Sequence, residues 1–272
     1  MNFENNVYEK HGLKIDKDRI LTFSQLRCPL DCSYCFVDDL NFNQQKNVAY
    51  LSQEQFALLE KLPEEIKLIM LGCDTEFFQS RKDSLDTLKK IAVLRRDISV
   101  ITKLSLSKGF IEEIKKIADL VSLNKNILTL SVSLPCYNLA KKWESKAPAP
   151  QKRIETLKLA HDAGIKTLVA IRPLLPSIVD EELEEIIKAT HDLCSGYYSG
   201  PLYLKSLDIL SEDERNQFLI EKVQPHWMPK GNIFYKVERQ GQMNVLQEIL
   251  NKYGKHLFEG AAEGIKYLKE NL

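Results

Sequence analysis

The chain has 272 residues, of which 44% are hydrophobic and 28% charged, the ordinary balance of a globular protein with a buried core. Lys plus Arg and Asp plus Glu both number 38, and a formal net charge of zero provides no overall attraction to nucleic acid or to a membrane surface. The first ten residues, MNFENNVYEK, contain no apolar run, and no stretch reaches the about 20 apolar residues of a membrane helix, so we expect a cytoplasmic protein without signal peptide or membrane contact.

Short β-rich runs alternate with longer, charged helical patterns over the first 210 residues. The predicted strands are Arg19–Ser24, Lys67–Gly72, Ile98–Thr102, Ile127–Ser133, Lys166–Arg172 and Leu202–Leu207. The predicted helices are Ser52–Lys61, Ser84–Arg95, Lys108–Leu120, Pro150–Ala163 and Asp180–Cys194. This alternation indicates a parallel sheet with helices on its outer face, and its strand–helix units are too few for a closed eight-fold barrel.

The pattern changes after about residue 210. A helix is predicted at Glu212–Val223, then a loop and a short strand within residues 225–238, and then helices at about Gly241–Tyr253 and Lys255–Leu272. We therefore expect residues 1–210 to form a core barrel and residues 211–272 to form a short C-terminal α/β extension that packs on it within a single structural unit.

Three cysteines lie close together in the segment RCPLDCSYCF. Cys28, Cys32 and Cys35 are separated by three and then two residues, so three thiolates on one short loop can hold three irons of a [4Fe–4S] cube and leave the fourth iron open. Zinc is the alternative because it also binds thiolates, but it takes four ligands and the next cysteine, Cys73, is far downstream. Six cysteines in the whole chain are too sparse for a disulfide framework.

Polar residues follow the ends of the predicted strands, where parallel sheets bind ligands. Gly72 lets the backbone approach a ligand closely, and the weak S–H bond of Cys73 suits quenching of a carbon radical, although a free cysteine is also commonly packed in the core. Lys103 suits a ligand carboxylate, with a solvated loop lysine as the alternative. Arg172 suits a carboxylate or phosphate, with a salt-bridge network that closes the barrel as the alternative.

The cysteine spacing, with Tyr34 directly before the last cysteine, resembles the signature of the radical S-adenosylmethionine (SAM) superfamily. The resemblance implies an open partial (β/α)6 barrel, similar to a TIM barrel, with chemistry at the carboxyl ends of the strands. It implies a [4Fe–4S] cluster on Cys28, Cys32 and Cys35, and SAM bound to the open iron. An electron from the cluster would cleave SAM to methionine and a 5′-deoxyadenosyl radical, which abstracts a hydrogen atom from the substrate.

The same resemblance implies roles for the strand-end residues. In LIMLGCDTEFFQ, Gly72 and Glu76 match a Gly-Gly-Glu-like motif that holds the SAM amino group, with Cys73 in place of the second glycine. Lys103 would contact the SAM carboxylate, and Ser131 or Ser133 the ribose hydroxyls. Glu144 matches a family acid that pairs with Arg153 or with SAM.

A narrower resemblance, over roughly Ile20 to Asp180, is to the spore photoproduct lyase-like branch. It rests on the patterns at Gly72–Gln79, Val100–Lys103, Trp143–Pro148 and Arg153–Pro176. The branch implies that Cys73 donates hydrogen to a product radical and that Tyr34 takes part in the radical relay. A second relay tyrosine of that branch is replaced here by Phe36, which cannot take that role.

We therefore expect a radical SAM enzyme with lyase-like or modifying activity that receives electrons from a flavodoxin or ferredoxin. Its expected substrate is a nucleic acid base, and the aromatic rings of His226, Trp227 and Tyr235 would stack on it unless they are packed in the core. A small molecule or peptide of a biosynthetic pathway is the second hypothesis, favoured by the zero net charge and by Arg172. The third is a non-catalytic iron–sulfur or zinc protein, which would not cleave SAM.

Overall fold

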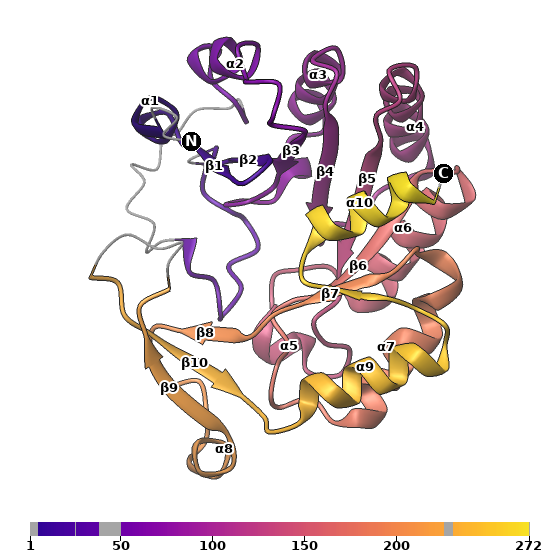
Figure 1. The fold of residues 1–272 in the computed structure, drawn as a ribbon. Coiled ribbons are helices and arrows are strands. Elements are labelled where there is room, and N and C mark those ends of the chain that lie inside the picture. The colour runs from indigo at the N-terminus through magenta and orange to yellow at the C-terminus, as the bar shows by residue number, and fades with distance from the viewer. Residues whose placement is uncertain (1–4, 25, 38–49, 226–230, 272) are drawn as a thin grey trace.

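An eight-stranded curved sheet organises the computed structural model, which describes residues 5–24, 26–37, 50–225 and 231–271 (Figure 1). The strand order is β1-β2-β3-β4-β5-β6-β7-β11. Only β1 is antiparallel to its neighbour in this sheet. The strands are β1 (Leu13–Asp16), β2 (Arg19–Thr22), β3 (Leu68–Leu71), β4 (Asp97–Thr102), β5 (Leu128–Ser133), β6 (Lys166–Ile171), β7 (Tyr197–Ser199) and β11 (Leu257–Phe258).

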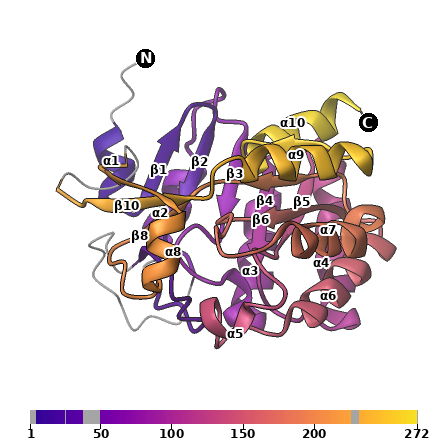
Figure 2. The ribbon, with the colours of Figure 1, turned by 90° about the horizontal axis from the view of Figure 1, so that it is seen from below.

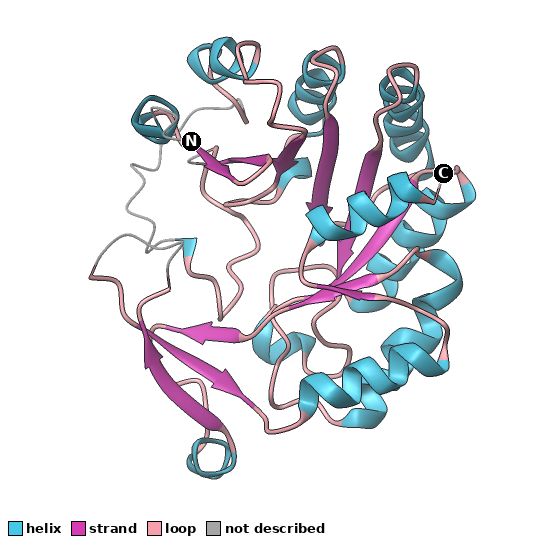
Figure 3. Ribbon diagram, in the orientation of Figure 1, coloured by secondary structure: helices cyan, strands magenta, loops and turns pink. Residues whose placement is uncertain are grey.

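Helices cover the outer face of the sheet, as the strand–helix alternation predicts (Figure 3). They are α2 (Gln53–Leu59), α3 (Arg81–Ala92), α4 (Lys108–Ser122), α6 (Pro150–Asp162) and α7 (Asp180–Thr190), and α9 (Gln242–Lys252) packs on α7. Val100 and Leu130 point toward this layer and are completely buried. The central strands are buried on both faces, which explains their nearly continuous apolar sequences.

The inner face of the curved sheet is partly covered by the last helix, α10 (Ala261–Glu270), which lies across the sheet in Figure 1. Ile265 and Leu268 pack there with Leu168 and Tyr198. Lys269 pairs with Asp97 at 2.9 Å, and Asp97 is the first residue of β4. The helix therefore closes the inner face near the amino ends of the strands and leaves their carboxyl ends for a site.

A second, three-stranded antiparallel sheet lies beside the main one, in the order β8-β10-β9 (Figure 2). Its strands are β8 (Leu202–Leu204), β9 (Leu219–Val223) and β10 (Phe234–Glu238), and the short helix α8 (Glu212–Gln217) precedes β9. The remaining elements are α1 (Asn5–Lys10), α5 (Ala140–Trp143) and the turns η2 (Phe77–Gln79) and η3 (His191–Leu193).

The sixth predicted strand, Leu202–Leu207, does form a strand at Leu202–Leu204, but this strand does not belong to the main sheet. The strand that follows β6 in the main sheet is Tyr197–Ser199, and Leu202–Leu204 pairs with β10 in the small sheet. Gly200 and Pro201 separate the two strands, and proline cannot donate a ladder hydrogen bond. The Arg172 side chain also crosses Gly200, because a Cβ there would lie 3.1 Å from its Nε atom.

Two C-terminal helix predictions also need correction. The helix predicted at Glu212–Val223 ends at Gln217, and Leu219–Val223 forms β9, whose Ile220 and Val223 are β-branched and favour a strand. The helix predicted at Lys255–Leu272 begins only at Ala261, because Leu257–Phe258 joins the main sheet as a parallel partner of β7. Within the described residues, no helix is long and apolar enough to cross a membrane.

Candidate cofactor site

The three cysteines of the spaced motif lie on the loop that follows β2, at the carboxyl edge of the parallel strands. Cys28 and Cys32 are half-buried, Cys35 is exposed, and none of them forms a disulfide. A turn joins two of them, since the Cys35 amide donates to the Cys32 carbonyl at 2.9 Å. Burial is the main reason that the pKa of Cys32 is raised to about 11, although the Lys103 ammonium opposes this shift.

Among the residues that the structure describes, no three His, Cys, Asp or Glu side chains converge on one point as the ligands of a single ion would. Three thiolates that each bind a different iron of a cube do not need to converge in this way. The sulfur-only donor set on one loop therefore fits an iron–sulfur cluster better than a preformed single-ion site.

A single buried carboxylate connects the cysteine loop to the rest of this edge. Glu144, directly after α5, has no exposed side-chain surface, and it accepts hydrogen bonds from the Tyr34 hydroxyl and from Arg153 Nη1, the latter at 2.5 Å. Lys103 Nζ lies 3.6 Å from Glu144 Oε1, the oxygen that also accepts from Tyr34, whereas Arg153 binds Oε2. Burial is the largest single influence on the pKa of Lys103 and lowers it, but the charges of Glu144, Cys32 and Glu76 together outweigh burial and raise this pKa. Glu144 and Arg153 therefore do form the buried ion pair that the sequence analysis considered.

The turn after β3 depends on a glycine. Gly72 has φ +82°, and a Cβ on it would lie 3.1 Å from the carbonyl oxygen of Ile101, so another residue would be strained and crowded. Its amide donates to the hydroxyl of the buried Tyr50 at 2.6 Å. Cys73 follows, with its Sγ donating to the Met70 carbonyl at 3.5 Å. Burial first, and the neighbouring Asp74 carboxylate second, raise the pKa of Cys73 to about 12.

Two acids in this turn are buried and hydrogen-bonded within the chain. Ser24, at the start of the cysteine loop, donates to both oxygens of Asp74 at 3.2 Å. Glu76 accepts from the Thr102 hydroxyl at 2.7 Å and from the Lys103 amide at 2.9 Å. Burial raises the pKa of Glu76, although these hydrogen bonds oppose the shift. Glu76 thus joins the ends of β3 and β4, and its contact with SAM stays a prediction.

The remaining predicted residues lie on the inner face at the same edge. Ser131 pairs in register with Ile101, and Ser133 with Ala170, so both hydroxyls face inward. The Oγ atoms of Ser131 and Ser133 are both buried and have no hydrogen-bond partner among the described residues, and the Tyr198 hydroxyl lies near Ser131. Arg172 follows β6 and is exposed over Gly200. An unpartnered buried hydroxyl is unusual in a packed protein and fits the approach of a polar ligand.

Three residues near this edge were not predicted from the sequence. Asp74 lies inside the Gly72–Gln79 motif, but only Glu76 was assigned a role as the acid of that motif. Tyr50 precedes a predicted helix, and nothing in the local pattern points to its contact with Gly72. Tyr198 was missed because its strand was not predicted, yet it faces inward from β7, opposite Ala170. His226 and Trp227 lie outside the described residues. Tyr235 belongs to β10, which lies between β8 and β9, and its side chain packs against the core.

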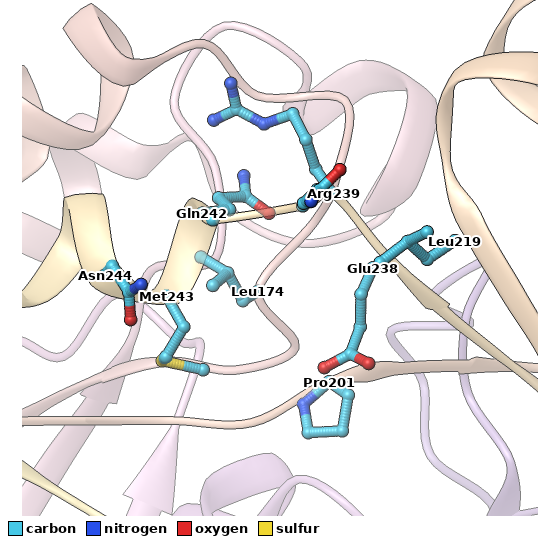
Figure 4. Close-up of a pocket in the computed structure, with 10 residues that line it drawn as sticks. Leu174, Pro201, Leu219, Glu238, Arg239, Gln242, Met243 and Asn244 are labelled. Carbon is cyan, nitrogen blue, oxygen red and sulfur yellow. The ribbon is translucent and has the colours of Figure 1, made fainter.

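A cavity of about 210 Å³ lies elsewhere, between β10 and the start of α9 (Figure 4). Figure 4 shows the side chains of Glu238 and Arg239 extending in opposite directions. Arg239 is already paired with Asp180 at 2.5 Å. None of the predicted site residues lines this cavity.

The fold and the candidate site together define an α/β half-barrel protein with a loop of three cysteines at the carboxyl edge of its sheet. A family comparison is specific: the sequence profile of the radical SAM superfamily matches residues 23–190, which include the cysteine loop and strands β3 to β6. The chain belongs to the radical SAM superfamily and is an enzyme of that class.

Individual relatives are distant. An uncharacterised protein of Methanocaldococcus jannaschii is 24% identical over 200 residues, which cover 71% of this chain and 74% of that protein. Spore photoproduct lyase complexed with a dinucleoside spore photoproduct has a similar structure, with a TM-score of 0.59, 13% identity and coverage of 85% of this chain and 74% of the lyase. Streptococcus suis SuiB bound to SAM gives a TM-score of 0.57 at 13% identity, over 90% of this chain but only 49% of SuiB. At these identities, the structural likeness establishes the half-barrel fold.

Proposed function

We propose that this enzyme binds a [4Fe–4S] cluster through Cys28, Cys32 and Cys35, cleaves SAM reductively and abstracts a hydrogen atom from its substrate. The observation that carries the proposal is the placement of three thiols on one loop at the carboxyl edge of a half-barrel. A cluster held by three thiolates supplies an open iron and an electron for the cleavage of SAM.

The chain's own residues would bind and orient SAM at this edge. Lys103 suits the SAM carboxylate, because its 3.6 Å contact with Glu144 is loose enough for a second anion to share the ammonium. Ser133 provides an unpartnered hydroxyl for the ribose, with Ser131 beside it. The Gly72 turn would bring backbone close to the ligand, and Glu76 would meet the SAM amino group. Arg172 lies on the same edge, where it suits an anionic group of SAM or of the substrate.

Cys73 and Tyr34 are the proposed residues of hydrogen transfer. The raised pKa of Cys73, about 12, keeps its sulfur protonated at neutral pH, which is the state that a hydrogen-atom donor needs. Tyr34 lies between two cluster cysteines, and its hydroxyl is already hydrogen-bonded to Glu144. Position 36, where the lyase-like branch has a second relay tyrosine, is Phe36 in this chain. Any radical relay here therefore has one tyrosine fewer than in that branch.

For the substrate we propose a nucleic acid base, which the kinship of the Gly72–Gln79 motif supports. The structurally similar lyase is described with a dinucleoside photoproduct. A peptide or small molecule is the second candidate, because a net charge of zero gives little general affinity for phosphates and because structurally similar SuiB is described with a precursor peptide. A flavodoxin or ferredoxin would supply the electron, and the absence of any disulfide among the six cysteines suits a reducing cytoplasm.

The test measures 5′-deoxyadenosine release by anaerobically reconstituted enzyme with SAM and dithionite, in the presence of irradiated DNA, RNA or a peptide library. Release that rises only with one nucleic acid, together with binding that weakens as salt increases, would support the base as substrate. Absence of nucleic acid binding at low salt would overturn that substrate class and favour the peptide or small molecule.

A further inference from the structure

The cysteine loop makes repeated contacts with one short segment more than 100 residues away in the sequence. We call residues 140–146 the docking segment. The Ser33 amide donates to the Trp143 carbonyl at 2.9 Å, and the Ser33 hydroxyl to the Lys142 carbonyl at 3.0 Å. The Tyr34 hydroxyl donates to Glu144, and Lys146 pairs with Asp31 at 2.5 Å. These contacts fall on Asp31, Ser33 and Tyr34, the residues on either side of Cys32 and directly before Cys35.

These contacts differ in strength. The Lys146 and Asp31 side chains are 58% and 59% exposed, and an ion pair in that setting contributes little. Tyr34 donates to a charged acceptor whose side chain is fully buried, and such hydrogen bonds are about twice as strong as neutral ones. The Tyr34 ring also lies 6.4 Å from that of Trp143, centroid to centroid, and Trp143 is fully buried. The contact of Tyr34 with Glu144 is therefore the main one.

Glu144 is itself held in place from the opposite side. Arg153, which has no exposed surface, binds Glu144 at 2.5 Å and also donates to the carbonyls of Pro148 at 2.8 Å and Ser133 at 3.1 Å. The carboxylate is therefore connected to α6 and to the end of β5, two rigid elements of the barrel. A side chain fixed in this way can orient the loop that binds to it.

We propose that the docking segment preorganises the cysteine loop before any cluster binds, with Glu144 as the positioning residue that holds the Tyr34 hydroxyl. This proposal depends on the proposed function in one respect, the identity of the group that the loop binds, which is the cluster. A loop that is already ordered loses less conformational freedom when it binds its ligand, and its affinity is correspondingly higher. Glu144 thereby acts through Tyr34 and needs no direct contact with the cluster.

The test compares Tyr34→Phe with the wild type in the iron-free protein and after reconstitution. Tyr34→Phe keeps the ring and removes only the hydroxyl. We expect the amides of Ser33 and Cys35 to exchange with deuterium about 10- to 150-fold faster, the range that corresponds to loss of a hydrogen bond to a charged group. We also expect the reconstituted variant to lose iron to EDTA faster by a similar factor, while the protein remains folded.

Two further variants serve as controls. Tyr253→Phe removes another tyrosine–glutamate hydrogen bond, to Glu184 at 3.3 Å, outside the loop and the docking segment, and should leave both readouts unchanged. Lys146→Ala removes only the exposed ion pair and should change them less than about twofold.

Unchanged exchange in Tyr34→Phe, or a wild-type loop that exchanges freely without iron, would overturn the docking proposal even if the enzyme cleaves SAM. If exchange is faster in Tyr34→Phe but the wild-type enzyme never cleaves SAM, the docking proposal is supported and the proposed function is overturned instead.

Discussion

Residue-level chemistry at the carboxyl edge is governed by burial. Glu76, Glu144 and Arg153 are nearly or completely buried, and each makes hydrogen bonds with neighbouring elements of the barrel. Lys103 Nζ lies 3.6 Å from Glu144 Oε1. Residues that the sequence assigned to SAM therefore also hold the strand ends together, so a substitution at this edge can affect stability as well as binding.

Cys73 provides a prediction that separates SAM cleavage from product formation. In Cys73→Ala, 5′-deoxyadenosine should still form, because none of the proposed cluster or SAM contacts is removed, whereas clean product formation should fail or divert to side products. Chromatography of nucleoside and substrate-derived products would measure both. Cys194→Ala, which changes a buried cysteine on the far side of β6 and β7, is the control. Normal product from Cys73→Ala would remove this thiol from the mechanism.

Glu144→Ala should destabilise the protein strongly. The change leaves the Arg153 guanidinium buried without its carboxylate partner, and removal of one member of a buried ion pair costs about 3–5 kcal/mol. The free energy of unfolding, from urea titration followed by circular dichroism, measures the loss. Glu155→Ala breaks a pair in which both side chains are 59% exposed and should cost less than about 1 kcal/mol. Equal losses in the two variants would contradict the central position of Glu144.

At the scale of elements, the sequence predicts those helices and strands that have a clear hydrophobic periodicity or clear turn signals at their ends. The five strands from β2 to β6 and helices such as α4 and α6 fall close to their predicted ranges, because long apolar runs and clear helix starts mark them. Strands β7, β8 and β11 have two or three residues each, too few for a periodic pattern, and were misplaced or missed. Contacts between distant segments, such as Tyr34 with Glu144, have no local signal at all.

The short strand β11 offers a test of close packing between elements. A Cβ on Gly196, just before β7, would lie 2.5 Å from a ring carbon of Phe258 in β11. Gly196→Ala should therefore destabilise the protein by about 1–3 kcal/mol, the range typical of overpacking. Thermal unfolding would measure this loss of stability. Gly109→Ala, in α4 with nothing within 4 Å of the new carbon, should be neutral or stabilise by up to about 1 kcal/mol. A neutral Gly196→Ala would show that β11 is not packed as described.

In the described part of the molecule, α10 closes the inner face near the amino ends of the strands, and the predicted site residues gather at the carboxyl ends. The segment after residue 210 contributes a strand to the main sheet and places α10 against the inner face, with Ile265 and Leu268 buried there. The sequence predicted the half-barrel class that the structure confirms, and the residues that it marked as a candidate site do lie at the carboxyl edge of the sheet. It could not predict that α10 covers the inner face, because amphipathic periodicity identifies an apolar helix face without identifying its partner.

The central claim is that the three spaced cysteines hold a cluster that drives SAM cleavage. The most direct measurement is iron and sulfide content, followed by 5′-deoxyadenosine release with SAM and dithionite, for the anaerobically reconstituted wild type, Cys32→Ala and Cys194→Ala. We predict about four irons per chain and release of 5′-deoxyadenosine for the wild type and Cys194→Ala, and loss of both in Cys32→Ala. Zinc in place of iron, or a complete cluster without SAM cleavage, would contradict the claim.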